Sequence, residues 1–169
     1  LLLVTVQDYN TKQITTFGSR PAQVSQKNVN FVYCKDEFAL INTFLAWWQN
    51  NTPEVVTGWN CELYDIPYLI GRISRLMGEK VAKKFSPWNI VKVKEVQISG
   101  RKQLSCEIAG VSIIDYLDLY KKSPATPNQE SYRLDHIASV ELNQNKLDHS
   151  EFDTFRDFYT NNWQKFVEY

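Results

Sequence analysis

Residues 55–69 read VVTGWNCELYDIPYL, and this stretch predicts a strand, a turn and the start of a helix. The β-branched run that ends at Thr57 is typical of a buried parallel strand, and Gly58 ends it. Because proline is tolerated only in the first turn of a helix, Pro67 indicates that the helix begins at Asp65. In open α/β sheets, sites form where a strand ends and a helix begins. Asp65 is therefore the first candidate functional residue.

Asp65 has two interpretations. An aspartate just before a helix is most often an N-cap that accepts hydrogen bonds from unpaired backbone amides, and Asp-Ile-Pro alone favours that role. The longer pattern favours a functional role. It places Gly58, Asn60, Tyr64 and Asp65 at set spacing, followed by proline, tyrosine and leucine.

This pattern resembles the second exonuclease motif of the family B DNA polymerases. Residues 112–122 (SIIDYLDLYKK) and 131–135 (SYRLD) are similar to the matching segments of the T-even phage branch of that family. The resemblance implies that Asp65 binds a metal ion in a 3′→5′ proofreading site. It also implies that Asn60 lies at the DNA-binding cleft and that Tyr64 contacts or shapes the path of the frayed strand.

Two motifs of the family are incomplete in this chain. The first motif, Asp-x-Glu on the central strand, does not occur in the sequence. The third is a tyrosine followed four residues later by an aspartate, a spacing that puts both on one helix face, and Tyr169 occupies the tyrosine position. We therefore expect residues 1–169 to be a 3′→5′ exonuclease domain without the first-motif strand and the end of the third motif. The chain alone is expected to be inactive.

The resemblance implies hydrolysis of 3′-terminal nucleotides with two Mg²⁺ or Mn²⁺ ions, a reaction that needs several converging carboxylates. Asp65 would be one metal ligand, and Tyr169 would orient the attacking water. The implied partners are the single-stranded 3′ end of primer–template DNA, the polymerase domain of the same chain and phage replication accessory proteins. The implied location is the cytoplasm of the infected host cell. The alternative is a catalytically inactive nucleic-acid-binding module of the same fold.

Charge is unevenly distributed along the chain, although the formal net charge is zero. From Arg72 to Lys102 there are nine basic residues and two acidic ones, Glu79 and Glu95. Such a segment is either a solvated face or a surface that follows a nucleic-acid backbone. The three cysteines are widely spaced and odd in number, which predicts a reduced, intracellular protein without a disulfide framework. The sequence contains no apolar run of membrane-spanning length, so no membrane association is expected.

Residues 90–98 alternate between apolar and polar side chains, residues 99–102 predict a turn, and residues 103–108 predict a returning strand. This predicts an extended basic hairpin. The resemblance implies that a hairpin inserted here helps to pass the primer strand to the exonuclease site. The alternative is an edge hairpin whose lysines protect it from aggregation. The candidate DNA contacts on it are Lys92, Lys94, Arg101 and Lys102.

The order of the predicted elements indicates an α/β fold: a ribonuclease-H-like mixed sheet with flanking helices and an inserted β-hairpin. At the matching family positions Asp115 and Asp118 are expected to be structural carboxylates. The remaining predicted elements are meandering strands at 1–7, 13–17 and 31–34, a helix from Asp36, a strand at 111–114 and a helix to Lys122, then a helix from Ser131 to Val140, a polar linker at 143–150 and a helix at 151–169.

Overall fold

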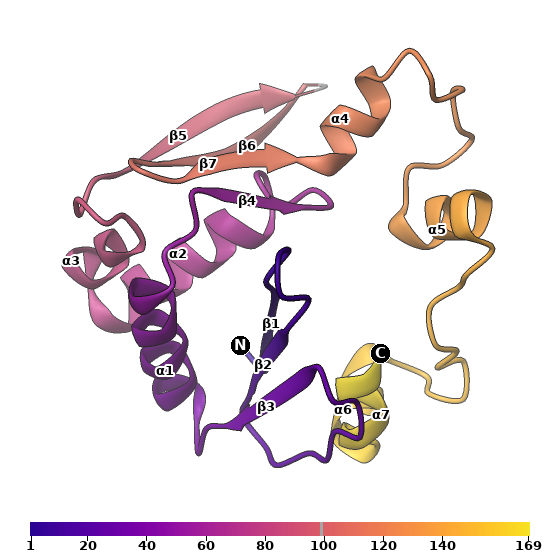
Figure 1. Cartoon of the computed structure of the whole chain (residues 1–169), viewed down its shortest axis with the longest axis horizontal. Coiled ribbons are helices and arrows are strands. Elements are labelled where there is room, and N and C mark those ends of the chain that lie inside the picture. Colours follow the sequence, from indigo (N-terminus) through magenta and orange to yellow (C-terminus); the bar gives the residue numbers. More distant parts are fainter. Residues whose placement is uncertain (99) are drawn as a thin grey trace. The chain divides into compact units, whose positions relative to one another are not determined.

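The computed structural model describes residues 1–98 and 100–169 and divides the chain into two compact units (Figure 1). Unit 1 comprises Leu1–Phe44 and Ala138–Tyr169, and unit 2 comprises Leu45–Ile137.

Unit 1 contains a three-stranded mixed sheet in the order β1-β2-β3. Strands β1 (Leu3–Gln7) and β2 (Ile14–Gly18) form the predicted antiparallel hairpin. Strand β3 (Val29–Tyr33) runs parallel to β2, so the predicted meander is wrong at this strand. The cause lies in the connecting loop, which crosses back before β3 begins instead of turning tightly.

The loop between β2 and β3 is held against the C-terminal helices of the same unit. The backbone amide of Gln23 donates to the Gln164 side chain at 3.0 Å, and the Gln164 amide donates to the Gln23 carbonyl at 2.7 Å. The Arg20 guanidinium donates to the carbonyl of Tyr159 at 3.2 Å. Hydrogen bonds from side chains thus satisfy backbone groups of this loop that a helix or strand would otherwise pair.

The C-terminal segment forms two short helices, α6 (Phe155–Asn161) and α7 (Trp163–Glu168), instead of the single helix predicted over 151–169. The break falls at Asn162, whose backbone has φ −136° and ψ 71° and whose side chain accepts the Lys165 amide. Asparagine favours such capping positions over helix interiors. Phe158 is fully buried at the centre of an aromatic cluster in this unit.

Polar residues in the sequence explain where helices α1 and α5 begin. Helix α1 (Glu37–Asn50) follows Asp36, whose carboxylate accepts the Ala39 amide at 2.7 Å, as expected of an N-cap. Helix α5 (Leu134–Leu142) begins three residues later than predicted, because Ser131 bonds the Arg133 amide in a local turn.

Unit 2 is built on a two-stranded parallel sheet of β4 (Val55–Gly58) and β7 (Ser112–Asp115). Helix α2 (Asp65–Met77) follows β4 and buries Ile66, Ile70 and Ile73, and it ends at Gly78, which has φ +92°. These boundaries confirm the predicted start and stop of this helix. The other elements of the unit are α3 (Glu79–Ala82), the 3₁₀ helix η1 (Lys83–Phe85), β5 (Val91–Ile98), β6 (Arg101–Ile108) and α4 (Tyr116–Lys122).

Strands β5 and β6 form the predicted antiparallel hairpin, with Val91 opposite Ile108 and Ile98 opposite Arg101. Arg101 and Lys102 belong to β6 and not to the turn, and the predicted turn residue Ser99 lies outside the described residues. The mixed α/β class with flanking helices and an inserted hairpin is confirmed, and it fits a ribonuclease-H-like exonuclease fold. No helix in the described part of the chain is long and apolar enough to cross a bilayer.

Candidate functional site

The turn between β4 and α2 is held by one buried carboxylate, that of Asp115 at the end of β7. Asp115 Oδ1 accepts the backbone N–H of Asn60 at 3.0 Å, and Oδ2 accepts that of Glu62 at 3.0 Å. Oδ1 also accepts the N–H of Leu117, so Asp115 caps α4 as well. Because β4 and β7 are parallel neighbours, their C-terminal ends meet and place this carboxylate beneath the turn.

These contacts give Asp115 a structural role and place Asp118 in an ion pair on the surface. Asp115 is 8% exposed, and backbone amides occupy both of its oxygens. Asp118 forms an exposed ion pair with Lys122, four residues later on α4, at 2.6 Å. The sequence predicted the position of Asp115 at a strand end but contained no signal for the amides it binds.

Asp65 is the first residue of α2, and the N-cap position belongs to Tyr64, which makes no side-chain cap bond. The N-cap interpretation of Asp65 is therefore wrong. Its carboxylate interacts with its own backbone amide and accepts no hydrogen bond from another described residue. Partial burial raises the pKa of the Asp65 carboxyl, the charge of Asp115 raises it further, and the Asp65 backbone amide lowers it.

Glu62 and Cys61, which precede Asp65 in the turn, have structural roles. The Glu62 carboxylate accepts the Ser105 hydroxyl of β6 at 3.0 Å, which ties the turn to the hairpin. The Cys61 thiol is buried, and burial together with the charges of Asp115 and Asp65 raises its pKa to about 11. A thiol with that pKa is not a nucleophile at neutral pH, and the described cysteines are all unpaired.

Asn60 has a backbone φ of +63°, in the left-handed region that asparagine adopts more readily than most residues. The turn thus supplies a backbone reason for an asparagine at this position. Tyr64 is 66% exposed and its ring lies nearly parallel to that of Tyr68, with centroids 6.5 Å apart. Trp59 is anchored instead, since its indole N–H donates to the Tyr132 carbonyl at 3.1 Å.

The basic side chains of the hairpin are partly neutralised across its strands. Lys94 pairs with Glu107 at 2.5 Å, and Lys102 pairs with Glu95 at 2.7 Å, all of them exposed. The hydrogen bond and charge of Lys94 lower the pKa of the Glu107 carboxyl, and Lys92, opposite Glu107 in the register, lowers it further. Arg101 lies opposite Ile98. The hairpin is therefore less cationic than the sequence suggested.

Tyr169 lies in unit 1, at the end of α7, in the aromatic cluster around Phe158. The Lys146 ammonium donates to its hydroxyl at 3.3 Å and lies 4.9 Å from the centre of its ring. Since an ammonium group only donates, the phenol oxygen is the acceptor and its own proton is directed elsewhere. Lys146 falls in the predicted polar linker, where nothing in the sequence distinguished it.

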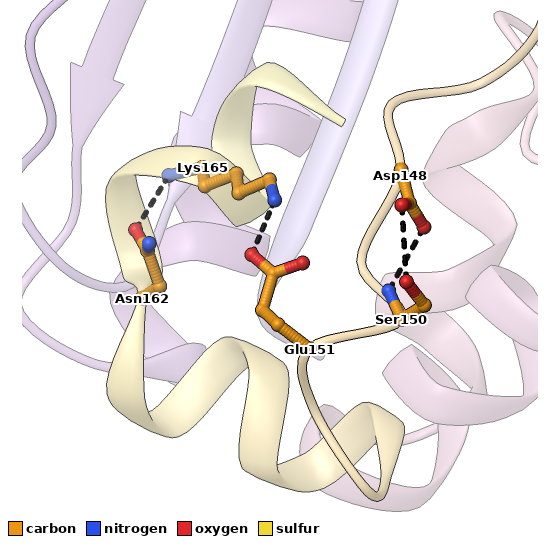
Figure 2. A network of polar contacts seen from close by, with 5 residues as sticks. All are labelled: Asp148, Ser150, Glu151, Asn162 and Lys165. Carbon is orange, nitrogen blue, oxygen red and sulfur yellow. Dashed lines mark hydrogen bonds and ion pairs between the residues drawn. The ribbon is translucent and has the colours of Figure 1, made fainter.

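The segment before Tyr169 is fixed by a short polar network (Figure 2). The Ser150 amide and hydroxyl donate to the two Asp148 oxygens at 2.9 and 3.0 Å. The Lys165 ammonium pairs with Glu151, and the Lys165 amide donates to the Asn162 side chain at 3.1 Å. These bonds tie the loop before α6 to α7.

Within the described residues, no three histidine, cysteine or carboxylate side chains are grouped in a way that holds a metal ion. Asp65 fits the role of a single ligand, because its side chain is exposed and its carboxylate accepts no hydrogen bond from another described residue. A divalent cation bound there would offset the partial burial and the Asp115 charge that raise the pKa of this carboxyl.

The features above define a class of protein: an α/β domain with a carboxylate exposed at a strand–turn–helix edge beside a basic hairpin. The family model for the exonuclease domain of DNA polymerase family B matches residues 2–137. The chain belongs to this family.

Three relatives illustrate the family. The chain is 39% identical over 127 residues to the DNA-directed DNA polymerase of Escherichia phage RB69 and 37% identical over 131 residues to that of Enterobacteria phage T4. These matches cover 75% and 77% of this chain. The DNA polymerase catalytic subunit of human herpesvirus 7 is 26% identical over 147 residues, 82% of the chain. In each case the match covers 14% of the relative's length.

Proposed function

We propose that this chain is the 3′→5′ proofreading exonuclease domain, over residues 1–169, of a phage DNA polymerase. The observation that carries the proposal is the Asp65 carboxylate. It stands at the first residue of α2, is not used as a helix cap, and belongs to a domain of the family B exonuclease type. Its substrate would be the single-stranded 3′ end of primer–template DNA.

The named residues have separate roles in this proposal. Asp65 would hold one of two divalent ions, Mg²⁺ or Mn²⁺, which supply charge stabilisation and activate water when bound. Tyr169 would orient the attacking water through its hydroxyl proton, which is left free because Lys146 donates to the oxygen. Asn60 and Tyr64, on the turn that leads to Asp65, would contact the frayed strand.

The hairpin would contribute phosphate contacts through Lys92, Lys94, Arg101 and Lys102. Its exposed position and its link to the turn through Glu62 and Ser105 support this role. The partners would be the polymerase domain of the same chain and phage replication proteins. The protein would act in the cytoplasm of the infected cell.

Excision by the complete polymerase tests the proposal. A primer with a mispaired 3′ nucleotide should lose that nucleotide in Mg²⁺ or Mn²⁺ and keep it in excess chelator, while a fully paired primer is degraded much more slowly. Absence of excision by a polymerase that still extends paired primers would instead support a catalytically inactive nucleic-acid-binding module.

A further inference from the structure

A second cationic surface lies at the C-terminal end of α2, on the segment formed by α3, η1 and the turn after them. We call residues 79–89 the lysine turn. Lys80, Lys83 and Lys84 are exposed, and Trp88 is 66% exposed. Figure 1 shows α3 at the end of α2 that is remote from Asp65. Helix α2 has thirteen residues and is therefore about 20 Å long at 1.5 Å per residue.

Buried hydrogen bonds fix the backbone of the lysine turn. Phe85 is fully buried, and its carbonyl accepts the Trp48 indole N–H at 2.8 Å. The buried Ser86 hydroxyl donates to the Ala109 carbonyl at 2.7 Å and accepts the Trp88 amide at 3.1 Å. A fixed backbone therefore presents the lysines and the indole, which lowers the entropy lost when they bind a ligand.

The charge of the lysine turn is less compensated than that of the hairpin. Glu79 is the one acidic residue in the sequence between Arg72 and Lys94. In the described part of the chain, no ion pair involves Lys80, Lys83 or Lys84. On the hairpin, by contrast, Lys94 and Lys102 are paired with carboxylates.

We propose that the lysine turn is a second contact surface for single-stranded DNA, where the three lysines bind phosphates and Trp88 stacks on an unpaired base. The choice of DNA as the polyanion rests on the proposed function. Unpaired cations on a fixed backbone suit a phosphate chain, and an exposed indole beside them offers a flat face for stacking. A duplex would offer no free base face to Trp88.

The first arm of the test measures the affinity of the complete polymerase for a single-stranded oligonucleotide across a range of salt concentrations. The protein carries Asp65→Ala and the buffer contains chelator, so that the DNA stays intact. Replacing Lys80, Lys83 and Lys84 by alanine should reduce the slope of log K against log salt by about 2, since each phosphate contact on single strands contributes about 0.7. The matched control replaces Lys12, Lys27 and Lys35, three exposed lysines of unit 1, and should leave the slope unchanged.

The second arm isolates stacking. Trp88→Ala should weaken binding roughly 5- to 150-fold without changing the salt slope, the range expected for loss of one base–aromatic stack. Trp88→Phe should retain most of the affinity. The effect of Trp88→Ala should shrink on an oligonucleotide that lacks bases at successive positions.

An unchanged salt slope in the triple-lysine variant would overturn the proposal. The proposal would also be overturned if the Trp88→Ala variant bound normal strands as tightly as its parent does. Loss of binding to an acidic replication protein, with DNA binding intact, would assign the surface to a protein partner and would equally overturn it. Failure of the proposed function is a different result, namely that the polymerase with native Asp65 releases no mispaired nucleotide.

Discussion

The Asp65 carboxylate is less stable as an anion in the folded chain than in water, because partial burial and the nearby Asp115 charge both oppose ionisation. The same environment favours a bound cation, so the unfavourable electrostatics support a ligand role.

The raised pKa of Asp65 has a consequence for stability. A carboxyl group whose pKa is higher in the folded state destabilises the fold at pH values above that pKa, and this effect disappears as the pH falls through it. Asp65→Asn should therefore leave the free energy of unfolding in metal-free buffer at pH 7 equal or slightly higher, by less than about 1 kcal/mol because the side chain is largely solvent-exposed. The difference should vanish on acidification. A clear loss of stability at pH 7 would contradict this account.

Asp115 makes the opposite prediction. Its two oxygens accept the amides of Asn60 and Glu62, and an amide side chain would point a donor at one of them. Asp115→Asn should lower the free energy of unfolding by about 2 kcal/mol, measured by urea denaturation. Asp118→Asn is the control, and it should cost less than about 0.5 kcal/mol because the ion pair that it weakens, with Lys122, is exposed. Equal effects of the two substitutions would refute the role given to Asp115.

At this scale the sequence predicts residue types better than their partners. Gly58 and Pro67 correctly placed Asp65 at the start of a helix, because the constraints that glycine and proline impose on the backbone are local. The clamp by Asp115 could not be predicted, because it depends on the register of β4 against β7 across more than fifty residues. The contact of Lys146 with Tyr169 depends in the same way on tertiary packing.

At the scale of elements, the hairpin shows how pairing changes the meaning of a charge count. Replacing Lys92, Lys94, Arg101 and Lys102 by alanine should flatten the salt dependence of DNA binding by the complete polymerase. The reduction should be smaller than the roughly 3 units expected of four free cations, because Glu95 and Glu107 already pair with two of them. An unchanged slope would make the hairpin an ordinary edge structure.

Elements with strong local signals were predicted and those set by packing were not. Helix α2 begins and ends where proline and glycine indicate. The C-terminal apolar positions suggested one helix, but capping by Asn162 divides it into α6 and α7. The parallel pairing of β3 with β2 and the short α3 carried no periodic signal in the sequence.

At the scale of the whole molecule, the described residues contain one proposed metal ligand and no cluster of three. Two divalent ions need several carboxylates. The 169-residue chain by itself should therefore show little or no nuclease activity on single-stranded DNA, even in Mn²⁺. Rapid degradation that stops on addition of chelator would contradict this expectation.

The most direct test of the central claim is release of a mispaired 3′ nucleotide by the complete polymerase and by its Asp65→Ala variant, with primer extension and melting temperature measured on both. If Asp65 holds a metal ion, excision should fall by several orders of magnitude in the variant, while extension and melting temperature change little. A variant that melts a few degrees lower but still excises the mismatch at a near-normal rate would contradict the claim and leave Asp65 with a purely structural role.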